Sequence, residues 1–117
     1  MRRHLETTHR ADVASHSVQA YEVLTSVLNA NPRPLVLDSF CGSAHSTAAL
    51  AARHPGHLVV GIDRSAQRLA KHARGSNDNY LLLQADCADI WKLLTDAGLR
   101  TDYHYMLYPN PWPKAGH

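Results

Sequence analysis

Four short, mainly apolar segments, each separated from the next by a helical pattern, constrain the fold of this chain more than any other feature. They span residues 35–38, 57–63, 80–84 and 103–108. The first three are continuously apolar rather than alternating, which is typical of strands buried on both faces of a parallel sheet. Helical patterns fill the intervals at 46–53, 65–74 and 89–98. The order predicts an α/β fold, a Rossmann-like doubly wound parallel sheet with right-handed crossovers.

Signals at the segment ends set the expected boundaries. Ser65 is a candidate N-cap for the helix over 65–74, with Gly75 as its left-handed stop. Asp89 is a candidate N-cap for the next helix, which ends near Gly98.

An amphipathic helix is predicted before the sheet, from Asp12 to about Leu28, because apolar residues recur there at helical spacing. The prolines at 32 and 34 end it. Residues before Thr8 lack periodicity and are expected to form a loose arm. The chain therefore divides into an arm with a helix, 1–34, and a sheet domain, 35–117.

The composition excludes several classes of protein. No apolar run approaches the ~20 residues of a membrane span, so no membrane association is expected. The basic N-terminus leads into a polar stretch, unlike a signal peptide. Cys41 and Cys87 are too few for a disulfide framework and are expected to be reduced thiols in the cytoplasm. The nine histidines lack the spacing of metal ligands, so no metal site is predicted.

The turn after the first predicted strand is the leading candidate for a binding site, because parallel sheets bind ligands at the carboxyl ends of their strands. Gly42 lets this turn bend tightly and approach a ligand. Asp63 follows Gly42 by 21 positions, a separation at which an acid can accept hydrogen bonds from ribose hydroxyls. The alternatives are an ordinary strand–helix turn and an aspartate that only caps the next helix. The spacing predicts a nucleoside ligand without naming it.

Two details favour S-adenosylmethionine over a dinucleotide. The GxGxxG fingerprint is absent, and Asp38 would repel a pyrophosphate but suits an ammonium or sulfonium group. Asp86, after the third predicted strand, can accept a hydrogen bond from an adenine amino group. Its alternative role is in the first turn of the following helix.

These segments resemble the first three motifs of class I S-adenosylmethionine-dependent methyltransferases, in the stretches 36–44, 61–63 and 85–86. Residues 108–117 read YPNPWPKAGH and resemble the PDPWPKxxH motif of the tRNA (guanine-N7-)-methyltransferase family. The likeness covers residues 35–117. It implies S-adenosyl-L-methionine as cofactor, tRNA or another RNA as partner, and methyl transfer to RNA as the activity.

The resemblance also implies roles for individual residues. The cofactor-binding set comprises Asp38, Ser39, Phe40, Cys41, Gly42, Asp63, Arg64, Ala85, Asp86 and Tyr108. The wall facing the substrate comprises Pro109, Asn110, Pro111, Trp112 and Lys114. Asn110 is the one residue expected to act in catalysis, by positioning the substrate. Methyl transfer from a sulfonium requires mainly such positioning.

The chain departs from the family pattern at three points. Phe40 and Ala44 stand where the class usually has glycine, which brings the turn closer to the DxFCGSG turn of amino-methyltransferases. Asn110 replaces the acid of PDPW and gives a sequence similar to NPPY-type motifs. The family's fold also continues beyond this motif, so we expect either a truncated chain or a homodimer that covers the open sheet edge.

Three other functions stay open at this point. The first is an inactive or truncated S-adenosylmethionine-binding or interaction module. The others are an amino-methyltransferase and a nucleotide-binding oxidoreductase domain.

Overall fold

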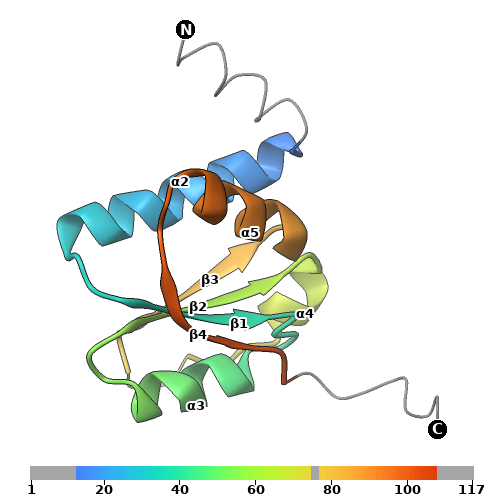
Figure 1. Ribbon diagram of the computed structural model, residues 1–117. Helices are drawn as coiled ribbons and strands as arrows, with labels where there is room; N and C mark the ends of the chain where they lie inside the picture. Colours follow the sequence, from blue (N-terminus) through green and yellow to red (C-terminus); the bar gives the residue numbers. More distant parts are fainter. Residues whose placement is uncertain (1–12, 75–76, 108–117) are drawn as a thin grey trace, which may run out of the picture.

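The described residues form a four-stranded, all-parallel sheet, as the sequence predicts, and the strand order is β3-β2-β1-β4 (Figure 1). The computed structural model describes residues 13–74 and 77–107. The elements are α2 (Ser15–Ala30), β1 (Leu35–Ser39), α3 (His45–Arg53), β2 (Leu58–Asp63), α4 (Ala66–Ala70), β3 (Tyr80–Gln84), α5 (Cys87–Asp96) and β4 (Thr101–Tyr105). Within the described residues, no helix is long and apolar enough to cross a membrane.

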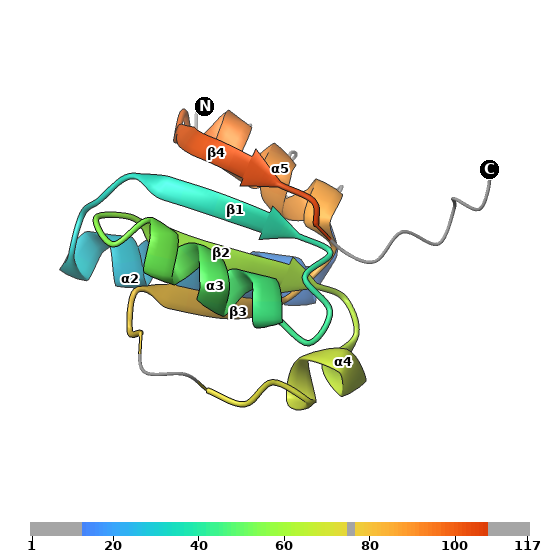
Figure 2. The same cartoon turned by 90° about the horizontal axis from the view of Figure 1, so that it is seen from below.

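Helices cover both faces of the sheet, α2 and α5 on one side and α3 and α4 on the other (Figure 2). Every residue of β1 and β2 is buried, which explains why their sequences lack alternation. Leu37 and Val60 pack toward α2 and α5, in one core cluster with Leu24 and Ile90. Val36, Val59 and Leu50 belong to the second cluster, on the α3 side.

Helix α4 ends at Ala70, earlier than the predicted Arg74, because the following residues make tertiary contacts. Nδ1 of His72 donates to the carbonyl oxygen of Ser43 at 2.9 Å, and Nε2 of His72 lies 2.6 Å from the Tyr80 hydroxyl. The guanidinium of Arg74 lies 4.1 Å from the centre of the Tyr80 ring. These bonds tie the segment to the turn after β1 and to β3. Ser65 caps α4 as predicted, and Gly75 lies outside the described residues.

The cap of α5 differs from the prediction. Asp86 is the N-cap, and its carboxylate accepts from the backbone N–H groups of Ala88 and Asp89. Asp89 lies in the first turn, and its carboxylate accepts from the backbone N–H of Ala14 at 3.3 Å. Asp89 thereby connects the start of α2 to α5 instead of capping a helix.

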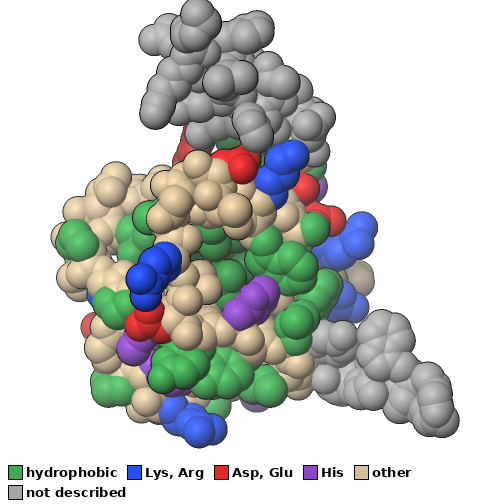
Figure 3. Space-filling view, viewed as in Figure 1, with side chains coloured by type: hydrophobic (Ala, Val, Ile, Leu, Met, Phe, Trp, Pro, Cys, Tyr) green, Lys and Arg blue, Asp and Glu red, His purple; other side chains and the backbone are tan. Residues whose placement is uncertain are grey.

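Strand β4 begins at Thr101, two residues before the predicted start, because Thr101 pairs with Leu35 of β1. Among the described strands, β4 has one neighbour and forms an edge of the sheet. Figure 3 shows hydrophobic side chains gathered on the face where β4 crosses in front of the sheet in Figure 1. The exposed large side chains of this part of the chain are Tyr103, Met106 and Leu107.

Candidate functional site

The turn between β1 and α3 has an unusual backbone, with three residues in the left-handed region. The φ angles are 58° at Phe40, 59° at Gly42 and 65° at Ala44. Glycine adopts this conformation freely, whereas a residue with a Cβ pays about 1–2 kcal/mol. Phe40 and Ala44 are the two positions where the methyltransferase resemblance expects glycine. The backbone at both positions therefore has the left-handed conformation typical of glycine, although neither residue is glycine.

Asp63 joins this turn to the end of β2. Its Oδ2 accepts from the backbone N–H of Gly42 at 2.9 Å, and its Oδ1 accepts from the backbone N–H of Ser65 at 2.9 Å. Nη2 of Arg68 donates to the same Oδ1 at 3.0 Å. Burial acts to raise the pKa of Asp63, but these hydrogen bonds outweigh it and the pKa is lowered. The side chain is 3% exposed and is held as a carboxylate.

Asp38, at the carboxyl end of β1, is fully buried. Its Oδ2 accepts from the hydroxyl groups of Ser46 at 2.6 Å and Thr47 at 2.7 Å. Its Oδ1 has no hydrogen-bond partner among the described residues. Burial raises the pKa of Asp38 despite the bonds from Ser46 and Thr47. This oxygen is an acceptor that a positively charged neighbour would stabilise.

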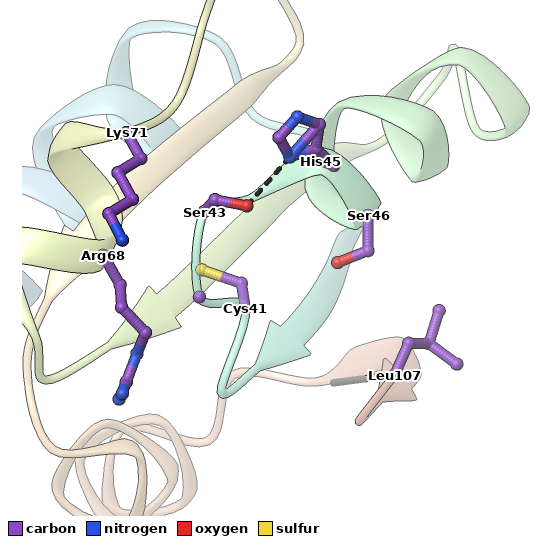
Figure 4. Close-up of a pocket in the computed structure, with 8 residues that line it drawn as sticks. Cys41, Ser43, His45, Ser46, Arg68, Lys71 and Leu107 are labelled. Atoms are coloured by element: carbon purple, nitrogen blue, oxygen red, sulfur yellow. Dashed lines mark hydrogen bonds between the residues drawn. The ribbon is translucent and has the colours of Figure 1, made fainter. Parts of the chain in front are cut away.

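A pocket of about 450 Å³ opens beside the turn (Figure 4). It is lined by Cys41, Gly42, Ser43, His45, Ser46, Arg68, Lys71 and Leu107. Arg68 and Lys71 lie on one side and Leu107 on the other, while the Ser43 hydroxyl bonds Nδ1 of His45 at 2.8 Å. The volume is within the usual range of small-molecule sites. Burial and the charge of Asp38 raise the pKa of Cys41 to about 12, so this thiol stays protonated and unreactive.

A second polar cluster lies on the α5 side of β1. The indole N–H of Trp91 donates to Oγ of Ser39 at 2.9 Å, and Nε2 of His104 lies 2.8 Å from the same oxygen. Burial lowers the pKa of His104, although the charge of Asp38 acts to raise it. Ser39 is fully buried, so it holds the end of β1 in place and does not face the pocket.

The structure brings together only part of the predicted cofactor set. Cys41 and Gly42 line the pocket, and Asp63 is bonded to Gly42. Ala85 is buried and Arg64 is exposed. The ring of Phe40 meets that of Trp91 edge-on, with the centroids 6.2 Å apart. The predicted residues 108–112 and 114, Asn110 among them, lie outside the described residues.

The predicted cofactor-binding set lacks six residues of the pocket wall: Ser43, His45, Ser46, Arg68, Lys71 and Leu107. Ser43 belongs to the turn within 36–44 that the sequence singles out. His45, Ser46 and Arg68 lie on helices and Lys71 directly follows α4, and the sequence alone gives no sign that these polar side chains face a cavity. The described residues contain no group of three or more His, Cys, Asp or Glu side chains placed to hold a metal ion.

Comparison with known proteins places the chain among methyltransferases. The model of a family described as "Putative methyltransferase" matches residues 32–117. Similar curated proteins include the tRNA (guanine-N(7)-)-methyltransferases of Nocardia farcinica, 35% identical over 72% of this chain, and of Paracoccus denitrificans, 30% identical over 81%. The match spans 32% of the length of the first and 42% of the second. No solved structure matches the chain.

Proposed function

The chain belongs to the methyltransferase family whose model matches residues 32–117, and on that premise we propose that it binds S-adenosylmethionine and serves methyl transfer to RNA. Its relatives' names point to guanine N7 of tRNA as the acceptor. The observation that carries the proposal is the bond between Gly42 and Asp63, beside a pocket of about 450 Å³ at the carboxyl ends of β1 and β2.

The residues present fit this cofactor. Asp63 is a carboxylate at the end of β2, where we expect it to accept from the ribose. Asp86 can accept from the adenine amino group through Oδ2, because both cap bonds go to Oδ1. The carboxylate of Asp38 lies behind the pocket wall, because its Oδ2 accepts from the hydroxyl of Ser46, which lines the pocket, and its Oδ1 has no partner among the described residues. A buried negative charge there favours a positively charged group in the pocket. The cofactor carries two such groups, an ammonium and a sulfonium.

The protein's part in the reaction is positioning. The cofactor supplies a methyl group already activated by the sulfonium, and guanine N7 attacks with its own lone pair. The turn at 41–43 holds the ligand against α3, while Arg68 and Lys71 place two cations on one side of the pocket. Such cations suit a phosphate backbone. The proposed wall facing the RNA is formed by Pro109, Asn110, Pro111, Trp112 and Lys114, with Asn110 orienting the base.

The test begins with calorimetric titration of the chain with S-adenosylhomocysteine. We expect binding in the micromolar range, abolished in Asp63→Ala and retained in Asp102→Asn, an exposed aspartate bonded to His57 at 3.0 Å. Absence of binding by a folded sample would contradict the proposal.

Methyl incorporation into tRNA from labelled S-adenosylmethionine then tests the reaction. We expect incorporation that is lost in Asn110→Ala. Cofactor binding without incorporation into any RNA would instead identify an inactive binding module.

A further inference from the structure

The carboxylate of Asp63 is nearly saturated with hydrogen-bond donors in this structure. A carboxylate has about four lone-pair positions, two on each oxygen. Oδ1 accepts from the backbone of Ser65 and from Arg68, and Oδ2 accepts from the backbone of Gly42. One lone pair therefore remains. The two hydroxyl groups of a ribose need two.

Of the three donors, only Arg68 is free to leave. The N–H groups of Gly42 and Ser65 belong to the backbone of the turn and of the α4 cap. The side chain of Arg68 is 58% exposed, so it can adopt another rotamer without disturbing the core. Binding a ribose diol at Asp63 thus requires Arg68 to move and not the backbone.

Arg68 also occupies the space above the turn. Its Cδ would lie 4.0 Å from a Cβ placed on Gly42, so the aliphatic stem passes over the one glycine of the turn. Arg68 and Lys71 lie on the same side of the pocket in Figure 4, opposite Leu107. The stem fills part of the region where a cofactor would pack, and the guanidinium covers the acid that would hold its ribose.

We propose that Arg68 is a cover over the ribose-binding carboxylate, competing with the cofactor for Asp63 and withdrawing when a nucleoside with both hydroxyl groups binds. This inference rests on the proposed function, because it assigns the ribose to Asp63. It makes Arg68 a residue that tunes affinity and selectivity for the ribose diol. A ligand that offers one hydroxyl group uses the remaining lone pair of Oδ2 and leaves Arg68 in place.

The test compares S-adenosylhomocysteine with its 2′-deoxy analogue by calorimetric titration of wild type and Arg68→Ala. An exposed ion pair is worth up to about 1 kcal/mol, so its removal should tighten S-adenosylhomocysteine binding about two- to five-fold. The affinity of the deoxy analogue should change by less than about two-fold, because its binding does not displace Arg68. Arg68→Met, which keeps the length of the stem and has no hydrogen-bond donor, should behave like Arg68→Ala.

Lys71→Ala is the matched control, because it removes the same charge from the same side of the pocket. It should leave the ratio of the two affinities at the wild-type value. Equal or weaker S-adenosylhomocysteine binding in both Arg68 variants would overturn this inference and leave the cofactor site intact. Failure of wild type and variants alike to bind would instead contradict the proposed function.

Discussion

Thr47 of α3 lies against Gly61 of β2 so closely that a methyl group on Gly61 would overlap the Thr47 hydroxyl oxygen. The same hydroxyl donates to the buried carboxylate of Asp38 at 2.7 Å. The absence of a side chain at Gly61 therefore allows α3 to lie close to β2. The close approach of α3 in turn places the Thr47 hydroxyl against the carboxylate of Asp38, at the end of β1.

Gly61→Ala should destabilise the protein by about 1–3 kcal/mol, because the added methyl group would also meet Leu82 Cδ2 at 3.0 Å and buried contacts cannot all relax. Urea unfolding followed by circular dichroism measures this. Gly56→Ala is the control, since no atom lies within 4 Å of the added Cβ, and it should change stability by less than about 0.5 kcal/mol. Equal effects of the two substitutions would contradict the packing argument.

Asn79→Asp should destabilise the protein by about 3 kcal/mol at pH 7. The buried amide of Asn79 donates to the carbonyl oxygens of Ala51, His54 and His57, at 3.0 to 3.1 Å. A carboxylate of the same shape would place negative charge against three acceptors. A protonated carboxyl group regains one donor, so the difference from wild type should shrink at pH 3 to 4. A difference that does not depend on pH would count against this explanation.

Asp38→Asn should weaken cofactor binding without lowering the stability of the protein at pH 7. Burial raises the pKa of Asp38, so the folded state holds its proton more tightly than the unfolded state. Wild type therefore gains stability as the pH falls from above the folded pKa toward the ordinary value, and the uncharged variant does not.

At pH 7 we expect Asp38→Asn to be as stable as wild type or more stable by about 1 kcal/mol, while S-adenosylhomocysteine binding weakens about tenfold or more. Urea unfolding at several pH values and calorimetry measure the two effects. A large loss of stability at pH 7 would show that the bonds from Ser46 and Thr47 outweigh the cost of burying the charge.

Trp91 fluorescence should report the protonation of His104, because the two ring centres are 5.1 Å apart. Burial lowers the pKa of His104 from its ordinary value of 6.5. The fluorescence of a Trp112→Phe background should therefore change with a midpoint below pH 6.5. Because the folded state resists protonation, stability should fall as the pH drops below about 6.5. His104→Asn should remove both transitions, and a midpoint above 6.5 would contradict burial as the cause.

The sheet could be predicted from the sequence because short, continuously apolar segments that alternate with helical patterns are typical of buried parallel strands. Strands β1, β2 and β3 match the predicted segments to within one residue at each end. The errors fall where tertiary contacts decide local structure. His72 leaves the helix pattern to bond Ser43 and Tyr80, and Asp89 bonds the backbone of Ala14 at the start of α2. None of these three contacts follows from the local sequence pattern, because each depends on how the chain folds back on itself.

The candidate site was predictable where it depends on the turns at the strand ends. Gly42 and Asp63, singled out in the sequence by their 21-residue separation, are joined by a hydrogen bond of 2.9 Å in the structure. The bond from Arg68 to Asp63 was not predictable. A basic residue on a short helix is usually solvated, and only the tertiary structure shows that this one contacts Asp63. The predicted roles in cofactor and substrate binding remain to be tested by the titrations above.

The order of the strands has a consequence for how the protein emerges from the ribosome. Strands β1, β2 and β3 join the sheet in the order of synthesis and spread outward to one side, each beside the strand made before it. Strand β4 instead pairs with the edge of β1 opposite β2, where Thr101 lies beside Leu35. Among the described strands, β1, β2 and β3 can therefore pair early, yet β1 keeps one unpaired edge until β4 has left the exit tunnel. During that interval the open edge of β1, which becomes central in the sheet, is available for wrong pairing.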